Sequence, residues 1–286
     1  MPSIMHRALR RVIRTGARPG LLGTAGRLCG RRIGWPLAHG PRIIIDRPDE
    51  FMQSAILWDG AYEPGIAGLL VAVLLPGDVF VDVGANAGQH SLIAASKKAR
   101  VFAFEPVPRL ARRLRDNVRL NRFEGQVTVV QMALAAHVGE ATLYVADRLD
   151  DGSHSLLPGI PATNVEAITV PVTTLDTALA QRLIERPQLV KIDVEGAEAL
   201  VLDGASALLA TQPQPVVIVE TGDRLARDIG ESARSVLSRL SARDYKIYGV
   251  HERTGALTPM PPNASSPAVG NYVAFPSKHK GMPLTT

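Results

Sequence analysis

The stretch VFVDVGANAGQHS, Val79 to Ser91, decides the fold of this chain. Apart from Asp82, its opening residues are apolar and mostly β-branched, which is typical of a buried strand. Gly84 to Gly88 then turn the chain into a helical segment. Glycine permits unusual φ angles and lets a ligand approach the backbone closely, so this unit predicts a nucleotide-like ligand at the turn.

Two ligands use such a turn, a dinucleotide and S-adenosylmethionine. A dinucleotide site usually has three glycines in the pattern GxGxxG, so that the pyrophosphate can rest on the helix N-terminus. Here Asn86 and Gln89 occupy the second and third glycine positions. A carboxylate at Asp82 is a poor neighbour for a diphosphate, but it suits the cationic amino-acid end of S-adenosylmethionine. The turn therefore favours S-adenosylmethionine, with a dinucleotide as the alternative.

A second acid follows at the end of the next strand, in Phe104-Glu105-Pro106, about 20 residues after the turn, where a carboxylate can accept hydrogen bonds from both ribose hydroxyls. NAD sites share this feature, so it supports an adenosyl ligand without separating the two. After the third strand, adenine is expected to bond to backbone groups and to pack against Met132. The candidate residues for binding this ligand, S-adenosylmethionine as the methyl donor, are Asp82, Gly84, Asn86, Gly88, Glu105, Pro106, Met132 and Ala133.

Strands and helices alternate along most of the chain, which predicts an α/β fold with about seven strands in a mostly parallel sheet and helices on both faces. The predicted strands are Val79–Val83, Val101–Glu105, Val127–Met132, Leu189–Val194, Val216–Glu220, Tyr245–Val250 and Tyr272–Phe275. The predicted helices between them are Gly88–Lys97, Arg109–Asn121, Glu198–Leu209 and Glu231–Arg243.

Around this core we predict four further segments. Residues 1–40 form a basic, flexible arm, and residues 41–76 form an extension that packs on the core. The main domain covers residues 77–276 and contains an insertion, residues 135–188, with a hairpin strand at Ala141–Ala146. Residues 277–286 form a tail. The extension is expected to contain a strand at Arg42–Asp46 and a helix within Tyr62–Leu75.

The net charge of +5 is unevenly distributed along the chain. Eight arginines, in addition to Arg42, precede the first acidic residue, Asp46. Such an arm can bind anionic lipid by charge, so we expect weak membrane-surface contact and no specific nucleic acid. The lone Cys29 excludes an internal disulfide framework and sites with several thiolates, which fits a cytoplasmic location. No apolar stretch approaches the roughly 20 residues that span a bilayer. The oligomeric state stays open.

Several motifs occur in an order that resembles the FkbM family of methyltransferases: VFVDVGANAGQHS, FAFEPVP, NVRLN, MALAAHVGEATLYV, SHSLLP, VTTLD, LVKIDVEGAEALVLDGA and VVIVE. The likeness covers residues 78–220, and its most specific part is KIDVEGAE, Lys191 to Glu198. The resemblance implies a Rossmann-like class I methyltransferase fold with S-adenosylmethionine as donor. It also implies O-methylation of a sugar, a glycan or a small specialised metabolite, without fixing the acceptor.

Ligands collect beyond the carboxyl ends of the strands in such a sheet, which places Asp193, Glu195, Glu198 and Glu220 near one crevice. Methyl transfer to oxygen needs an aligned acceptor and a group that removes one proton. Asp193 is the first candidate, Glu195 the second, and His154 in the insertion the third.

Other roles for these side chains stay open. Glu195 and Glu198 can simply favour a helix N-terminus, and Asp193, Glu195 and Glu220 could hold a divalent ion, although we expect no metal. His90 is a further candidate base, and Ser155 could contact the donor or belong to a lid. At the level of the whole protein, the alternatives are an NAD-dependent oxidoreductase and a membrane-associated binding protein without catalysis.

Overall fold

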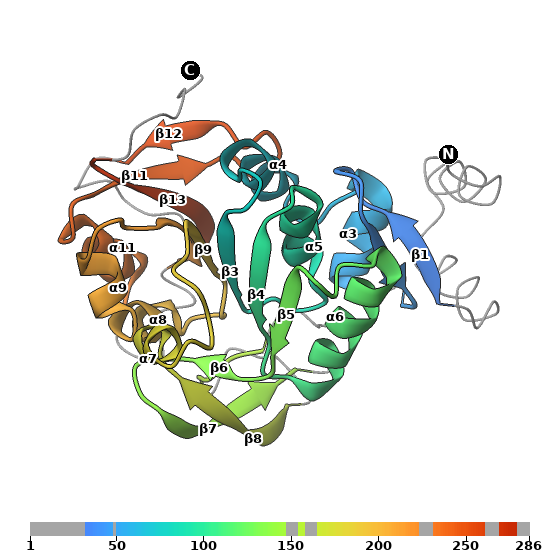
Figure 1. The fold of residues 1–286 in the computed structure, drawn as a ribbon, viewed down its shortest axis with the longest axis horizontal. Helices are drawn as coiled ribbons and strands as arrows, with labels where there is room; N and C mark the ends of the chain where they lie inside the picture. The colour runs from blue at the N-terminus through green and yellow to red at the C-terminus, as the bar shows by residue number, and fades with distance from the viewer. Residues whose placement is uncertain are drawn as a thin grey trace.

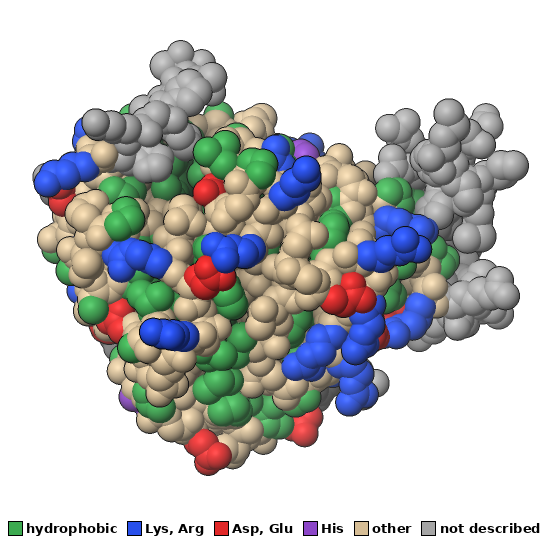
Figure 2. Space-filling model, in the orientation of Figure 1, with side chains coloured by type: hydrophobic (Ala, Val, Ile, Leu, Met, Phe, Trp, Pro, Cys, Tyr) green, Lys and Arg blue, Asp and Glu red, His purple; other side chains and the backbone are tan. Residues whose placement is uncertain are grey.

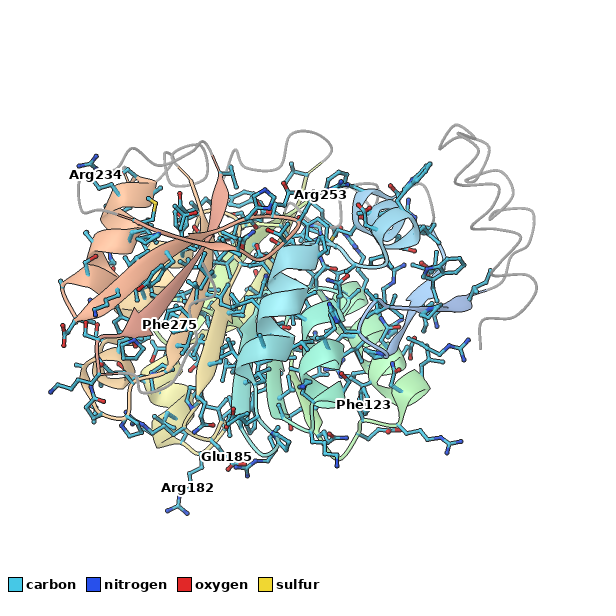
Figure 3. All side chains as sticks on the ribbon, turned by 90° about the horizontal axis from the view of Figure 1, so that it is seen from above. Phe123, Arg182, Glu185, Arg234, Arg253 and Phe275 are labelled. Atoms are coloured by element: carbon cyan, nitrogen blue, oxygen red, sulfur yellow. The ribbon has the colours of Figure 1, made fainter. Side chains whose placement is uncertain are left out.

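The computed structural model describes residues 32–47, 50–146, 154–157, 165–222, 231–260 and 269–278. Its centre is a sheet of eight strands (Figures 1 and 3). These strands are β3 (Val79–Val83), β4 (Arg100–Phe104), β5 (Val127–Val130), β9 (Leu189–Ile192), β10 (Val216–Thr221), β11 (Tyr245–Val250), β12 (Leu257–Pro259) and β13 (Gly270–Pro276). Their order is β12-β11-β13-β10-β9-β3-β4-β5.

Pairing in this sheet is mostly parallel. Strands β5, β4, β3, β9 and β10 pair in parallel, whereas β13 is antiparallel to both β10 and β11. The predicted Rossmann-like sheet of about seven strands is confirmed, and the short β12 adds one at the edge. The chain leaves β3 for β4 on one side and returns at β9 on the other, so the strand order reverses at β3 and opens a crevice at the carboxyl ends.

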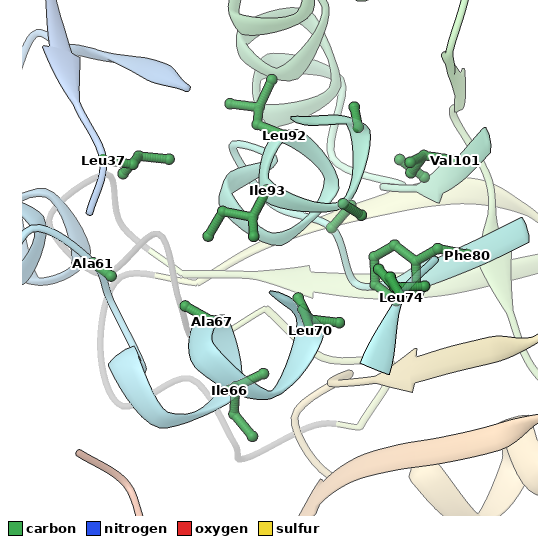
Figure 4. Packing of buried hydrophobic residues seen from close by; sticks show 14 of the residues in the cluster. Leu37, Ala61, Ile66, Ala67, Leu70, Leu74, Phe80, Leu92, Ile93 and Val101 are labelled. Carbon is green, nitrogen blue, oxygen red and sulfur yellow. The ribbon is translucent and has the colours of Figure 1, made fainter. Parts of the chain in front are cut away.

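Helices cover both faces because side chains alternate along each strand. One face carries α3 (Phe51–Asp59), α4 (Pro64–Val73), α5 (Gln89–Ser96) and α6 (Pro108–Asn121). The other carries α7 (Leu175–Ala180), α8 (Glu198–Asp203), α9 (Ser206–Ala210) and α11 (Ala233–Ser241). Figure 4 shows Phe80 of β3 in the same apolar cluster as Leu70 of α4 and Ile93 of α5, whereas its neighbour Val81 faces the opposite core.

The prediction of one helix over Glu198–Leu209 is wrong, because α8 ends before Gly204 and a new helix, α9, begins after it. A Cβ atom at Gly204 would lie 2.1 Å from the carbonyl oxygen of Ala135, so the backbones approach too closely there for any other residue. Among the described helices, none alone is long and apolar enough to cross a membrane. Only α3 and α4 together pass that test of length and composition, and they are bent by 69°.

The N-terminal part packs against the core earlier than the predicted arm boundary at residue 40. Strand β1 (Ile33–Pro36) pairs with β2 (Arg42–Ile45), and Trp35 in β1 is 1% exposed. The side-chain amides of Asn117 and Asn121, four residues apart on α6, bond to the backbone of β2. These residues therefore attach the hairpin to α6, whereas residues 1–31 and 279–286 of the predicted arm and tail lie outside the described chain.

Two strands of the insertion, β7 (Gly139–Val145) and β8 (Glu166–Thr173), join β6 (Ala133–Leu134), which directly precedes it. They form a separate three-stranded sheet in the order β6-β8-β7. Strand β7 confirms the predicted hairpin strand, and β8 is its partner. Ser155 adds a single antiparallel bridge to Tyr144. Residues 147–153 and 158–164 of the predicted long loop lie outside the described chain.

Candidate active site

A pocket opens at the carboxyl ends of β3, β4 and β9, where the strand order reverses. It contains about 1160 Å³ of empty space, part of which is open to solvent. Its lining contains these predicted site residues: Gly84, Asn86, Gly88, Glu105, Pro106, Met132, Ala133, His154, Asp193 and Glu195. Of the candidate donor-binding residues, Asp82 alone is not among those that line this pocket.

The glycine turn is shaped by the neighbouring strand as well as by any ligand. Gly84 has φ +81°, and a Cβ atom there would lie 1.8 Å from the carbonyl oxygen of Asp193. Asn86 also adopts a left-handed backbone, with φ 51°, and its side-chain oxygen accepts a hydrogen bond from the Ala87 N–H. Asparagine tolerates this region better than most residues, which explains its presence where a dinucleotide site has glycine.

Glu105 holds the turn to the end of β4. Its two carboxylate oxygens accept hydrogen bonds from the Asn86 and Val107 N–H groups, each at 2.8 Å. Burial raises the pKa of Glu105 to about 7 despite these backbone bonds, because only 4% of the residue is exposed. A buried carboxylate that lines the pocket and retains further acceptor capacity suits a pair of ribose hydroxyls.

Asp82 lies under the turn and does not line the pocket. Its carboxylate accepts a hydrogen bond from the Ser91 hydroxyl at 2.6 Å, which joins β3 to α5. Burial raises the pKa of Asp82, while the nearby Lys191 charge opposes that shift. Asp82 thus supports the turn from below, and its predicted contact with the donor stays a prediction.

Lys191 occupies the centre of the acidic crevice. Its ammonium donates to Asp193 at 2.7 Å and lies 3.7 Å from Glu63, although only 2% of its side chain is exposed. Burial lowers the pKa of Lys191, but the carboxylates of Asp193, Glu63 and Asp82 outweigh that effect and raise it above the ordinary value. Lys191 therefore stays charged and holds Asp193 in one position at the pocket wall.

Glu220, at the end of β10, is the second partner of Asp193. Burial and the charges of Asp193 and Glu63 raise the pKa of Glu220 to about 10, and its carboxyl group shares a hydrogen bond with Asp193. Within the described chain, Asp193, Glu195 and Glu220 are the one group with metal-ligand atoms all within 4.8 Å of one another. Because the buried Lys191 ammonium already pairs with Asp193, we keep the prediction that no metal is needed.

The loop of KIDVEGAE turns sharply, and this turn decides where its acids point. Glu195 has φ 52° and Gly196 has φ 102°, both in the left-handed region. The Glu198 side chain folds back and accepts a hydrogen bond from the Gly196 N–H at 2.9 Å. Glu195 lines the pocket, whereas the fully buried Glu198 does not. Of the two roles considered for Glu198, the structure supports stabilisation of the loop and helix start.

His154 and Ser155 connect the insertion to the site. The Nδ1 atom of His154 accepts a hydrogen bond from the Ala146 N–H at 2.9 Å, and its Nε2 atom lies 3.2 Å from Arg109. Burial, followed by the Arg109 charge, lowers the pKa of His154 to about 3, which makes it a weak proton acceptor. The Ser155 hydroxyl donates to the carbonyl oxygen of Glu195 at 2.6 Å, so Ser155 fixes the acidic loop rather than forming a free lid residue.

His90 faces the pocket from the first turn of α5. Its Nε2 atom is 3.8 Å from Glu63 and 3.3 Å from the Gln89 side chain. Burial and the nearby Lys191 charge lower the pKa of His90 well below its ordinary value, so the ring is neutral. A neutral ring surrounded by polar side chains is less suited than Asp193 to take a proton from an acceptor.

The N-terminal extension supplies a wall that the motifs did not predict. Its pocket-lining residues are Ile43, Ile44, Glu50, Met52, Gln53, Ile56 and Tyr62. Gln89 attaches this wall to α5, because its side-chain amide exchanges hydrogen bonds with the Tyr62 backbone N–H and carbonyl at 2.7 and 2.5 Å. A helix-start position that carries such a long polar side chain, buried to 4% exposure, is less open to a diphosphate than a glycine would be.

A reversed strand order with a glycine turn and a ribose-type acid defines a Rossmann-like domain that binds an adenosyl ligand. The model of the "Methyltransferase FkbM domain" matches residues 82–247, which is more than half of the chain. This chain belongs to the FkbM methyltransferase family.

Two curated relatives share this region. The hexuronic acid methyltransferase AglP of Haloferax volcanii is 30% identical over 160 residues, which cover 56% of this chain and 63% of AglP. The 31-O-demethyl-FK506 methyltransferase FkbM of Streptomyces tacrolimicus is 33% identical over 46% of this chain and 60% of that enzyme. The chain thus spans less than two thirds of either relative. The crystal structure of methyltransferase FkbM from Methylobacillus flagellatus is 18% identical, with a TM-score of 0.45, over 70% of this chain and 44% of that one.

Proposed function

We propose that this chain is an S-adenosylmethionine-dependent methyltransferase that methylates a hydroxyl group of a sugar, a glycan or a small metabolite. Glu105, which lines the pocket beside the glycine turn and bonds to the Asn86 N–H, supports an adenosyl ligand, and the match to the FkbM methyltransferase domain favours S-adenosylmethionine as that ligand. The acids across the pocket fit the positive charge of a sulfonium donor. The names of the two relatives, a hexuronic acid methyltransferase and an O-demethyl-FK506 methyltransferase, support a hydroxylated acceptor.

The bound donor would supply an activated methyl group for an in-line displacement by the acceptor oxygen. Glu105 and the turn would hold the adenosyl part, and Met132 with Ala133 would pack against the adenine. Asp193 would orient the acceptor hydroxyl and take its proton, because Lys191 fixes this carboxylate at the pocket wall. Glu195, on the same loop, is the second group proposed to anchor the acceptor.

The test is transfer of a labelled methyl group from S-adenosylmethionine by the purified full chain. Hexuronic acids and hexuronic-acid glycans are the first acceptors to supply, followed by cell extracts from which labelled products are identified. Label recovered on an acceptor oxygen supports the proposal. The oxidoreductase alternative is tested by thermal shift, because a ligand that binds the native state raises its unfolding midpoint. A shift with NAD and none with S-adenosylmethionine or S-adenosylhomocysteine would overturn the methyltransferase assignment.

Glu105 gives the first prediction, which concerns donor affinity and pH. Replacing Glu105 with Ala should weaken donor binding by the equivalent of about 1–3 kcal/mol, since buried hydroxyls of the ribose lose their partner. In the wild-type protein the pKa is about 7, and ribose hydroxyls bind the ionised carboxylate. Affinity should therefore be constant above that pH and weaken up to about tenfold per unit below it. Calorimetric titration from pH 5.5 to 8.5 measures both effects.

The matched control is Glu105→Gln, which keeps the shape of the side chain but cannot ionise. This variant should bind the donor more weakly than the wild type at pH 8 and show no dependence on pH near 7. If Glu105→Gln retained the wild-type pH profile, another group would have to cause it. If Glu105→Ala bound the donor normally, the ribose role would be wrong.

Metal dependence gives a second prediction. Methyl transfer should be unchanged after dialysis against EDTA, because the Lys191 ammonium pairs with Asp193 and reduces the negative charge there without a metal ion. The measurement is the initial rate before and after chelation, with Mg²⁺ or Mn²⁺ then added back. A loss of rate that either ion restores would instead assign the group Asp193, Glu195 and Glu220 as a metal site.

A further inference from the structure

Helix α3 has one face toward the pocket and another that is exposed. Its inner face contributes Met52, Gln53 and Ile56 to the pocket. On the outer face, Phe51 is 65% exposed and Trp58 is 46% exposed. These two residues are seven positions apart, which is two helical turns, so they lie on the same side of the helix. Two large aromatic side chains exposed together on one short helix are unusual on a protein surface that contacts only water.

Arginines lie on the elements that neighbour this helix. Residues 32–47, which form the β1–β2 hairpin and the segment after it, contain Arg32, Arg42 and Arg47 and a single acidic residue, Asp46. In Figures 1 and 3 the blue α3 and the β1–β2 hairpin lie on the same side of the molecule as the green α6. Figure 2 shows Lys and Arg side chains gathered on that side. The exposed arginines of the hairpin, α6 and the residue that follows it are Arg32, Arg42, Arg112, Arg119 and Arg122.

We propose that this side of the protein docks on an anionic lipid bilayer, with Phe51 and Trp58 inserted at the level of the headgroups. Aromatic rings favour that interfacial depth, and arginines nearby are attracted to anionic headgroups. A second copy of the chain is a poorer occupant, because two such basic surfaces repel each other. Since the inner face of α3 lines the pocket, docking through its outer face places the pocket about one helix diameter from the membrane surface. Under the proposed function, this position favours an acceptor carried at a membrane surface.

Trp58 offers a direct probe of the docked state. The chain has two tryptophans, and Trp35 is 1% exposed, so a lipid-induced change in emission reports Trp58. Adding the full chain to vesicles of phosphatidylcholine with phosphatidylglycerol should shift the emission to shorter wavelength and move the protein into the floating fraction. Vesicles of phosphatidylcholine alone should do neither. High salt should weaken the association, because headgroup charge contributes to it.

Matched variants distinguish the contribution of the two aromatic side chains to vesicle binding from the contribution of charge alone. Phe51→Ser combined with Trp58→Ser should reduce binding to the anionic vesicles by about tenfold or more. Leu75→Ser is the control, because Leu75 is 64% exposed but lies after α4, before the amino end of the central strand β3. It should bind as the wild type does, and circular dichroism should show all three proteins folded.

Three outcomes would overturn the proposal: no binding to anionic vesicles, equal binding by the double variant, or self-association in solution that the double variant abolishes. Vesicle binding is measured without donor or acceptor. Its failure would therefore leave the methyltransferase proposal standing, and failure of methyl transfer would leave docking standing.

Discussion

Replacing Asp193 with Asn should lower the rate constant of methyl transfer by about 10²–10⁴-fold, the range expected for loss of a positioned general base. The amide oxygen of Asn can still accept the hydrogen bond from Lys191, so the crevice should keep its shape. It cannot take a proton from an acceptor hydroxyl. Donor affinity should change much less than the rate, because Glu105 and the glycine turn hold the adenosyl part.

The measurement is a single-turnover rate at saturating donor, with S-adenosylhomocysteine binding followed by calorimetry. Glu198→Gln is the matched control: it makes the same change, carboxylate to amide, three residues beyond the Asp193–Glu195 pair, but Glu198 is buried and does not line the pocket. We expect Glu198→Gln to transfer methyl groups at a rate close to that of the wild type. If Asp193→Asn kept its rate and Glu195→Gln lost it, Glu195 would be the base.

Features that depend on neighbours in the chain were predictable from the sequence. The bounds of β3 and β11 agree with the predicted strands, and α6 differs from its prediction by a single residue. The position of Glu105 was predictable in the same way, because the carboxyl end of a strand beside the glycine turn lies at the crevice. Local apolar periodicity and turn residues determine such elements, so one sequence suffices.

Features that depend on distant contacts were not predictable. Nothing in the short apolar stretch of α3 says that Met52 and Ile56 will line a pocket built by strands far along the chain. The direction of Glu198 depends on the left-handed backbone at Glu195 and Gly196, which reverses the loop. One overlooked signal was present: Lys191 interrupts the otherwise apolar strand β9, and a buried lysine requires acidic partners.

Gly84 gives the second large effect, on stability. We expect Gly84→Ala to lower the free energy of unfolding by about 2–5 kcal/mol, from two causes that add. The left-handed backbone at φ +81° destabilises an alanine by about 1–2 kcal/mol. Its Cβ would also lie 1.8 Å from the Asp193 carbonyl oxygen, which belongs to backbone and cannot rotate away. The turn must move from β9, at a further cost of about 1–3 kcal/mol.

Gly68→Ala is the matched control for this experiment. Gly68 lies inside α4, its φ is not left-handed, and a Cβ atom there would meet nothing within 4 Å. Alanine should raise stability at that position by about 0.4–1 kcal/mol, because it restricts the unfolded chain. Comparing the urea unfolding free energies of the two variants therefore distinguishes the backbone strain at Gly84 from the general effect of replacing glycine with alanine. If Gly84→Ala were as stable as the wild type, the turn would be free to move away from β9, and the glycine would have to be explained by the ligand alone.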